Sequence, residues 1–424
     1  MESNKRKENT IFYLYVANIL NDPIIKSQVL NWIEVLQDQG IIFNILSCPS
    51  ILYLIKHKNR QKTIIKEFQS KLKGKIYQIT TLRSLDKFDF ISPVLKAMYI
   101  LFIIYKEGRN KNITRIILQS RAGFNYKAFK ILKKLNNKIK VVFDFRGAAP
   151  EEYLNSLAID DIAQVENSLI KRKYAQLVRK YADIINFGDL IYCVSDALKS
   201  YLLNMAGVRE CNNKIYAVPG AADENIFYYD SALRAKQRKE LGLGLKRIII
   251  YTGRLKSKYH KKESIFEFAA KFVGLDPSNY FICLTPDENI AKELTKSRLI
   301  SEDKILIKSI NNHAEINQFL NAADIGIILR DDVATNQVAS PTKLAEYLLA
   351  GLPVLVSEHI GDYSDFIRAN DLGMVVNNDI AEMILVINRF EIPSPNRIRN
   401  SEIAKARFSK QANLAIIKTA LSGL

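Results

Sequence analysis

The sequence predicts an α/β protein built from two doubly wound parallel sheets in tandem. Short apolar runs typical of buried strands alternate with helical segments in the first half, and this alternation restarts in the second half. The chain of 424 residues is also too long for one hydrophobic core. Its hydrophobic fraction of 48% and charged fraction of 25% are typical of a globular protein.

The elements of the first half follow from their apolar patterns. Short β-branched runs predict buried strands, and apolar residues at a helical period predict the helices between them. The strands are expected at residues 11–16, 41–46, 116–119, 141–145, 190–194 and 214–218. The helices are expected at residues 27–39, 126–134, 161–180 and 196–205. This alternation predicts a parallel sheet with helices on both faces.

The second half repeats the pattern after a boundary near residues 219–228. Its strands are expected at residues 247–252, 280–284, 304–307, 325–329 and 354–356. Its helices are expected at residues 262–273, 290–296, 314–321 and 342–350, and a last helix at residues 403–420. Ligands of such sheets bind at the carboxyl ends of the strands, so binding residues are sought there.

The formal net charge of +18 is unevenly distributed along the chain. Residues 1–180 hold 32 Lys and Arg against 15 Asp and Glu, a net of +17, and the remaining residues carry a net of +1. The first half is therefore expected to meet an acidic partner, either anionic lipid, nucleic acid or a phosphorylated acceptor. Nucleic acid is the least favoured of these, because basic and aromatic residues are not interleaved for base stacking.

Two segments of the basic half bear on membrane contact. Residues 56–75 hold eight Lys and Arg, and their apolar residues recur at helical spacing, which predicts a basic amphipathic helix on an anionic membrane surface. The alternative is an ordinary surface helix whose apolar stripe faces the core. The apolar run 97–105 is too short to span a bilayer, so a buried helix is expected there.

The cysteines and histidines give no sign of a metal site. The four histidines do not cluster, and the four cysteines are scattered without the spacing of metal ligands. The cysteines are expected to be reduced and mostly buried, as in a cytosolic protein. They are Cys48, Cys193, Cys211 and Cys283.

The most informative segment, residues 340–356, reads as a capped helix followed by a buried strand. Ser340 is expected to be the N-cap, Pro341 suits the first turn, and Gly351 ends the helix. A helix N-terminus attracts anions, Lys343 adds positive charge there, and a carboxylate one turn later suits hydroxyl groups. Together these features indicate a nucleotide or nucleotide-sugar site. The alternative is an ordinary capped helix of an α/β protein.

This segment resembles the donor-binding segment of the GT-B glycosyltransferases of the GT4 type, S-P-x-K-x-x-E-Y-x-x-x-G-x-P-V. The resemblance implies that the start of the helix meets the diphosphate of a nucleoside-diphosphate sugar and that Glu346 holds the ribose hydroxyls. The residues at the helix start are Ser340, Pro341, Thr342 and Lys343.

Two further donor contacts follow the strands of the second half. Gly253 and Arg254 match the family's G-R, where glycine admits the ligand and arginine grips the diphosphate. The family's lysine comes about five residues later; Lys261 is the preferred match and Lys258 the second. A solvated basic loop is the alternative. The backbone around Ile310 is expected to contact the base.

The segment that begins at Asp144 resembles D-x-R-G-x-x-P-E-E, which lines the acceptor side in this branch. Two charges directly after an apolar strand are poorly explained by packing. Arg146 is expected to meet a sugar hydroxyl or an acceptor phosphate, and the resemblance places it with Arg254 and Lys261 among the catalytic residues. The alternative is an Asp144–Arg146 pair that fixes the loop.

The sequence departs from the family at Val338. Typical retaining members carry two glutamates eight positions apart, and Val338 stands where the first is expected. The contact that this glutamate makes to the transferred sugar is then expected from Asn336 or from backbone N–H groups. Retention without an enzyme nucleophile would use the donor phosphate to deprotonate the acceptor, with Arg254 and Lys261 stabilising the leaving diphosphate. No metal or other cofactor is expected.

The resemblance implies a GT-B glycosyltransferase with two Rossmann-like domains facing across a cleft. Residues 1–220 would bind the acceptor, residues 221–402 the nucleotide sugar, and the helix in 403–424 would pack back on the first domain. The acceptor would be a lipid-linked or surface-polysaccharide precursor at the cytoplasmic face of an anionic membrane. The rivals are a nucleotide-sugar epimerase, for which no convincing acid–base carboxylate pair is found, and a non-catalytic nucleotide-binding protein.

Overall fold

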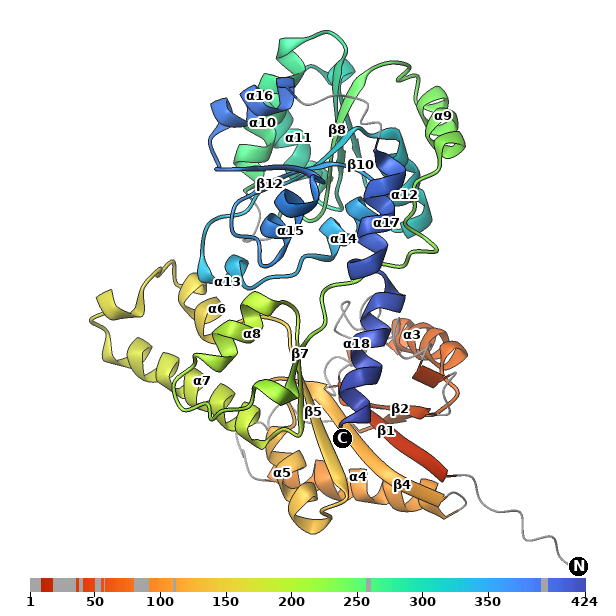
Figure 1. Cartoon of the computed structure of the whole chain (residues 1–424), viewed down its shortest axis with the longest axis vertical. Coiled ribbons are helices and arrows are strands. Elements are labelled where there is room, and N and C mark those ends of the chain that lie inside the picture. Colours follow the sequence, from red (N-terminus) through yellow and green to blue (C-terminus); the bar gives the residue numbers. More distant parts are fainter. Residues whose placement is uncertain are drawn as a thin grey trace, which may run out of the picture. The chain divides into compact units, whose positions relative to one another are not determined.

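The computed structural model describes residues 9–17, 36–37, 41–49, 55–56, 58–79, 91–109, 112–256, 261–389 and 396–424. The chain forms two compact units (Figure 1). The first unit consists of Met1–Cys193, Lys199–Val218 and Leu414–Leu424, and the second of Val194–Leu198 and Pro219–Asn413. The first unit thus includes both ends of the chain.

The first unit contains a parallel seven-stranded sheet in the order β3-β2-β1-β4-β5-β6-β7. The strands are β1 (Asn9–Ala17), β2 (Ile41–Ser47), β3 (Ile76–Gln78), β4 (Asn112–Arg121), β5 (Ile139–Phe145), β6 (Leu190–Cys193) and β7 (Ile215–Ala217). The chain builds outward from β1 to β3 and then returns to the other side of β1. The strand order therefore reverses between β1 and β4.

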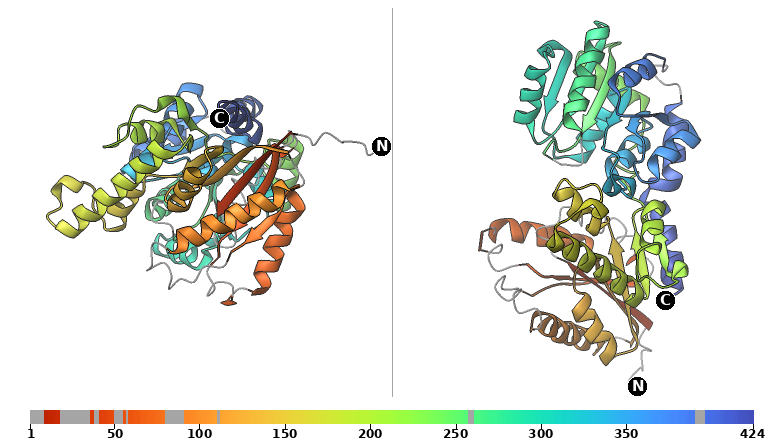
Figure 2. Two further views of the ribbon diagram at one scale, coloured as in Figure 1. Left: turned by 90° about the horizontal axis from the view of Figure 1, so that it is seen from below. Right: turned by 90° about the vertical axis from the view of Figure 1, so that its left-hand side faces the viewer.

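Helices cover both faces of this sheet (Figure 2). On one face, Tyr13 and Tyr15 share a core cluster with Phe68 and with Leu414 and Ile417 near the chain end. On the other face, the ring of Phe143 packs against residues of α5. The described α-helices that precede the second sheet along the chain are α3 (Lys58–Lys71), α4 (Ile91–Gly108), α5 (Tyr126–Leu135), α6 (Ala149–Ser156), α7 (Ser168–Phe187), α8 (Asp196–Leu203) and α9 (Ser231–Glu240). Of these, α9 belongs to the second unit.

The helix predicted at residues 161–180 is displaced in the structure. Asp161 caps only a short 3₁₀ turn, Ile162–Gln164, and the long helix α7 begins after Asn167. The Oδ1 atom of Asn167 accepts hydrogen bonds from two first-turn amides, which sets the start of the helix. The helix predicted at 27–39 lies almost entirely outside the described residues; only 36–37 are described, and they are helical.

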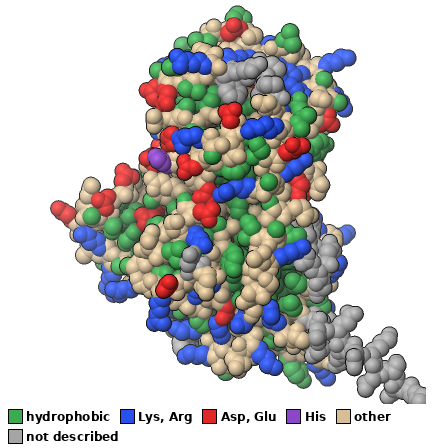
Figure 3. Space-filling view, in the orientation of Figure 1, with side chains coloured by type: hydrophobic (Ala, Val, Ile, Leu, Met, Phe, Trp, Pro, Cys, Tyr) green, Lys and Arg blue, Asp and Glu red, His purple; other side chains and the backbone are tan. Residues whose placement is uncertain are grey.

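The apolar stripe of the basic helix α3 faces the core. Phe68 and Leu72 are buried in the first unit, and Ile64 and Ile65 pack against them. The surface-helix alternative is therefore the correct one for this segment, since the residues that would enter a membrane already have partners. The basic residues of this unit remain on the surface, where Lys and Arg side chains are frequent (lower part of Figure 3).

The prediction that residues 97–105 form a buried helix is half right. This segment lies in α4, whose one face buries Ala97, Ile100 and Ile103. The opposite face is apolar and exposed, because nothing in the described structure covers it. We call this face the α4 stripe; it consists of Leu95 (48% exposed), Met98 (61%), Phe102 (56%) and Tyr105 (67%).

The second unit contains a parallel six-stranded sheet in the order β10-β9-β8-β11-β12-β13. The strands are β8 (Arg247–Thr252), β9 (Asn279–Leu284), β10 (Ile305–Lys308), β11 (Ile325–Ile328), β12 (Val354–Ser357) and β13 (Gly373–Val376). Alternate residues of β8 enter different cores: Ile248 and Ile250 face one cluster, whereas Ile249 and Tyr251 face the other. The sheet is thus covered on both faces.

The helices of the second unit are α10 (Lys262–Leu275), α11 (Glu288–Ser297), α12 (His313–Ala322), α13 (Ala334–Gln337), α14 (Thr342–Leu349), α15 (Tyr363–Asn370), α16 (Ile380–Arg389) and α17 (Arg397–Phe408). The single helix predicted at 403–420 is instead two helices, α17 and α18 (Lys410–Ser422). Ser409 is extended and forms a bridge with Ala222, whose N–H donates to the carbonyl of Phe408. This pairing interrupts the helix.

The prediction of two doubly wound parallel sheets is confirmed. Within the described part of the chain, no helix is both long and apolar enough to cross a membrane.

Candidate functional site

The predicted donor residues lie at the carboxyl ends of the strands of the second sheet. The chain runs from β8 outward to β9 and β10 and then returns to the other side of β8 with β11. Doubly wound sheets bind ligands where the strand order reverses in this way. Gly253 and Arg254 directly follow β8, and Arg330 and Asp331 follow β11.

Glycine is required at position 253. Its φ angle is 153°, and a Cβ atom there would lie 2.9 Å from the hydroxyl oxygen of Tyr251. The Gly253 N–H donates to the carbonyl of Leu284, which ties the end of β8 to the end of β9. The side chain of Arg254 is exposed beyond this turn, which leaves its guanidinium accessible to a ligand.

Lys261 is held at the same edge. It is the N-cap residue of α10, and its Nζ lies 2.9 Å from Oδ1 of Asp331. Its backbone N–H donates to the carbonyl of Leu329, so both its backbone and its side chain contact the segment after β11. A bound diphosphate could take the place of the Asp331 carboxylate. The second match for this lysine, Lys258, lies outside the described residues.

The start of α14 differs from the prediction by one residue. Pro341 is the N-cap, and Ser340, which was expected to be the N-cap, lies one residue before it. The Ser340 hydroxyl instead accepts a hydrogen bond of 2.8 Å from the N–H of Gly220. No side chain in the described structure caps the first-turn amides of α14. A helix start of this kind suits an anion, and Thr342 and Lys343 lie in it.

Lys343 and Glu346 form an ion pair on α14. Nζ of Lys343 lies 2.9 Å from Oε2 of Glu346. The Glu346 side chain is only 7% exposed, so the carboxylate is largely shielded from water. A buried carboxylate that retains its charge requires a partner, and the lysine supplies it. The two residues that the resemblance assigns to different parts of the donor are therefore neighbours.

Tyr347 joins α14 to β8. Its hydroxyl accepts a hydrogen bond of 2.7 Å from the N–H of Thr252, and its fully buried ring occupies the space where a Cβ of Gly326 would lie. Burial raises the pKa of this phenol well above its usual value, so it remains a neutral hydrogen-bonding group. The contact places the helix that carries Lys343 and Glu346 against the strand that leads to Gly253.

The loop between β11 and α14 is fixed by its own polar groups. The Asn336 side chain is buried; it donates to the carbonyl of Asp331 and accepts from the guanidinium of Arg330. Val338 is 5% exposed, and its carbonyl accepts a hydrogen bond of 2.7 Å from the Ser195 hydroxyl. Val338 thus places an apolar side chain where the resemblance expects the first of the two family glutamates. Ile310, after β10, packs against a core cluster.

Sequence reasoning overlooked Arg330 and Asp331. The Arg330 N–H donates to the Ser357 hydroxyl, so the residue joins the segments after β11 and β12. Both charges come directly after a buried apolar strand, which is the signal that singled out Asp144 and Arg146 in the first half. The same rule applied to the second half would have found them.

In the first unit, Asp144 and Arg146 form the ion pair that was the alternative interpretation. Asp144 is 2% exposed, and its Oδ2 accepts from Nε of Arg146 at 2.7 Å. The Arg146 side chain is 14% exposed. The pair fixes the loop after β5 and leaves little of the guanidinium in contact with solvent. Their role toward an acceptor stays a prediction.

Two comparisons place this chain among known proteins. Residues 292–397 match the family model described as glucosyltransferase 3-like, C-terminal domain. This region contains α14 and the loop before it, including Lys343 and Glu346. A search of curated protein sequences gave no match.

Solved structures share the fold over nearly the whole chain. A glycosyltransferase from Rickettsia africae ESF-5 aligns with a TM-score of 0.69 and 16% identity, over 98% of this chain and 99% of that one. Anabaena HepE in complex with UDP aligns with a TM-score of 0.68 and 14% identity, over 98% and 100%. WaaG, a glycosyltransferase of lipopolysaccharide biosynthesis, aligns with a TM-score of 0.58 and 13% identity, over 97% and 98%. The predicted GT-B fold and the resemblance to GT-B glycosyltransferases are confirmed.

Proposed function

We propose that this protein is a retaining glycosyltransferase of the GT4 type that transfers a sugar from a nucleoside-diphosphate sugar to a lipid-linked or surface-polysaccharide precursor. One observation carries the proposal: the hydrogen bond between Tyr347 and Thr252 holds α14 against the end of β8, directly before the turn that leads to Arg254. This arrangement gathers cationic groups, uncapped helix amides and a buried carboxylate at the switch point of one sheet. Such a set suits a diphosphate joined to a diol.

In this proposal the donor binds mainly through charge and hydrogen bonding. Arg254, Lys261 and the first turn of α14 hold the diphosphate, and Glu346 accepts hydrogen bonds from the ribose hydroxyls. The Lys343 ammonium then lies between the carboxylate and the diphosphate and can contact both. HepE has been solved in complex with UDP-glucose, which supports UDP as the first nucleotide to test.

Catalysis follows from stabilising the leaving group. The bond between the anomeric carbon and the diphosphate oxygen breaks, and the acceptor oxygen bonds to the same face of the sugar. The acceptor proton passes to the departing phosphate oxygen, and Arg254 and Lys261 stabilise the charge that develops there. Because Val338 stands where the resemblance expects a glutamate, the step proceeds without an enzyme nucleophile at that position. It also needs no metal.

The acceptor is proposed to lie at an anionic membrane surface that the first unit contacts from the cytoplasmic side. The concentration of Lys and Arg in residues 1–180 supports this location. The apolar contact is assigned to the α4 stripe, because the apolar residues of α3 face the core. The part that WaaG plays in lipopolysaccharide biosynthesis supports a lipid-linked acceptor.

The first experiment is thermal melting with UDP, GDP, ADP, CMP and dTDP, using the native chain, Glu346→Ala and Arg254→Ala. A ligand at a hundredfold its Kd adds about 2.7 kcal/mol of stability, which corresponds to a shift of about a few degrees. We expect one nucleotide to raise the melting temperature of the native chain and not that of Glu346→Ala or Arg254→Ala. Lys262→Ala, in the first turn of α10 beside Lys261, is the control that should still respond.

A negative result has a defined meaning. If no nucleotide stabilises a well-folded chain, the donor site is wrong. If a nucleotide binds but no nucleotide sugar is hydrolysed or transferred, the replacement of glutamate by Val338 marks a non-catalytic protein. Release of an epimerised sugar nucleotide without any acceptor would instead favour the epimerase.

A further inference from the structure

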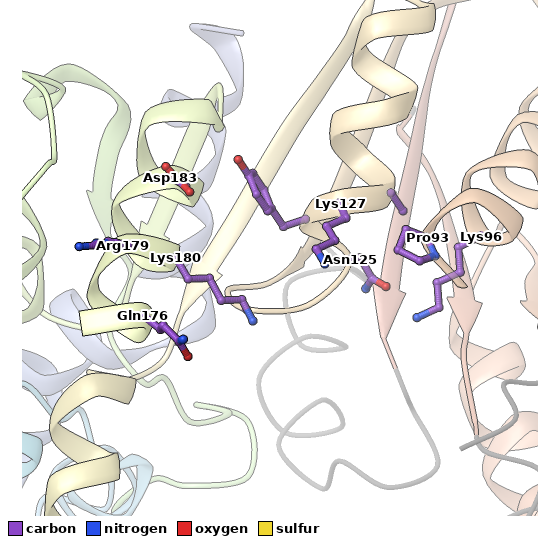
Figure 4. Close-up of a pocket in the computed structure, with 11 residues that line it drawn as sticks. Pro93, Lys96, Asn125, Lys127, Gln176, Arg179, Lys180 and Asp183 are labelled. Carbon is purple, nitrogen blue, oxygen red and sulfur yellow. The ribbon is translucent and has the colours of Figure 1, made fainter. Parts of the chain in front are cut away.

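The first unit contains a pocket that the donor site does not use. Its volume is about 630 Å³, and three helices and the loop after β4 form its walls (Figure 4). Of its described lining residues, those that matter for its chemistry are the cations Lys96, Lys127, Arg179 and Lys180, the acid Asp183, and Asn125.

The pocket lies where the strand order of the first sheet reverses. β1 and β4 are neighbours at this switch point, and the pocket-lining Gly123 and Asn125 follow β4. The Nδ2 of Asn125 donates to the carbonyl of Val16 at 3.4 Å, which joins the loop to the end of β1. By strand order this loop after β4 corresponds to the segment after β11 in the second sheet, which carries Arg330 and Asp331. Ligand binding at switch points is general for doubly wound sheets.

The charge of the pocket is strongly positive. Among the residues that the structure describes, four cations and one carboxylate line it, and they come from α4, α5 and α7. In Figure 4 the ammonium groups of Lys96, Lys127 and Lys180 point toward a common space, whereas Arg179 and Asp183 point away from it. The three lysines therefore set the field inside the pocket.

The start of α5 adds to this field. Asn125 precedes the helix in a left-handed conformation (φ 55°) and its side chain does not cap the helix. The first turn contains no acidic residue, and its members Tyr126, Lys127 and Ala128 line the pocket. Uncapped amides and lysines on the same wall favour a compact, multiply charged anion over a neutral sugar.

We propose that this pocket binds the phosphate or diphosphate group of the acceptor, so that the acceptor is a phosphorylated molecule. That the bound molecule is the acceptor rests on the proposed function. That the pocket binds an anion rests on the pocket alone. The proposal assigns the anionic group to Lys127 and Lys180, which line the pocket, and not to Arg146, which does not line it. The volume leaves room beside a diphosphate for the group attached to it.

The test measures binding of inorganic pyrophosphate by calorimetry at low ionic strength. Saturating UDP is present, so that the donor site is filled. We expect Lys127→Gln combined with Lys180→Gln to weaken pyrophosphate binding at least tenfold. The matched control is Lys171→Gln combined with Lys173→Gln, which removes the same charge from exposed positions of α7 outside the pocket. The control should change the affinity less than twofold.

Each outcome bears on one idea. Equal losses in the two double variants, or no binding to the native chain, overturn the pocket. Inorganic phosphate that binds as tightly as pyrophosphate would support a monophosphate as the anionic group, and weaker binding of phosphate would support a diphosphate. The melting shift with a nucleotide should be unchanged in both double variants. A failure of that shift in the native chain rejects the donor site and leaves the pyrophosphate result standing.

Discussion

At the residue scale, several positions are set by a close approach that only one residue type permits. Gly326 on β11 lies against the ring of Tyr347, and a Cβ at this glycine would come within 2.5 Å of that ring. The same tyrosine hydroxyl holds β8 through Thr252. The pairing of a glycine on β11 with a tyrosine on α14 thus determines how closely α14 approaches the sheet.

Gly326→Ala should destabilise the second unit by about 1–3 kcal/mol, because the added methyl group overpacks a full core. Chemical unfolding followed by the fluorescence or circular dichroism of the chain measures the change. Gly274→Ala is the control, since Gly274 lies in α10 with open space around it and alanine favours helix there. A neutral result at Gly326 would mean that α14 is held some other way.

At the element scale, α4 has two different tasks. Its inner face contributes Ala97, Ile100 and Ile103 to the core, and its first turns contribute Lys96 to the pocket. Its outer face leaves the α4 stripe exposed, with apolar residues three or four positions apart along one side. An exposed apolar stripe on a strongly basic unit is typical of a surface that meets anionic lipid.

Met98→Ser combined with Phe102→Ser should abolish flotation of the protein with vesicles of anionic lipid while the melting temperature stays unchanged. Both side chains are exposed, so their loss removes little packing. Ile55→Ser, an equally exposed apolar residue outside α4, is the control and should float normally. Loss of a concentration-dependent dimer in the double variant, with flotation unchanged, would identify the stripe as a contact between copies.

At the scale of the whole molecule, the cysteines report on how completely the two units are packed. All four are free thiols; Cys193, Cys211 and Cys283 are buried and Cys48 is half-buried. Burial raises the pKa of Cys48 to about 11 and that of Cys283 further. A raised thiol pKa keeps the thiolate fraction small at neutral pH, and the thiolate is the reactive form.

The folded chain should therefore react slowly with a thiol reagent at pH 7.5, and four thiols should react at once in denaturant. The reaction of the folded chain should accelerate as the pH rises toward 11, because thiolate forms at Cys48 in that range. Absorbance of the released thiolate of the reagent measures both rates. A thiol that reacts immediately in the folded chain at pH 7.5 would contradict the burial of these residues.

Much of the fold could be predicted because buried parallel strands are nearly continuous apolar runs, as at residues 247–252, where β8 was found without error. The break at Ser409 could not, since the bridge to Ala222 joins residues far apart in the sequence. The same holds for Ser340, which suits an N-cap locally but binds the backbone of Gly220 instead. Local patterns find elements, and long-range partners decide where they end.

For the candidate site as well, the sequence predicted some of the residues and missed others. The motif around Glu346 could be recognised because its members follow one another in a single short stretch of the sequence, residues 340–354. The ion pair of Lys261 with Asp331 could not, because it joins the ends of two strands that become neighbours only in the folded sheet. The cationic pocket of the first unit was missed for this reason, since its lysines come from three separate helices.

The composition of the first unit has a consequence for how the protein is made. Its core includes Leu414, Ile417, Ala420 and Leu421, which a ribosome adds only after the whole of the second unit. The second unit is continuous in sequence except for a short segment, so its residues are all available before the core of the first unit is complete. A chain terminated before residue 414 would therefore lack these four residues and expose the aromatic face of its first sheet to chaperones and proteases.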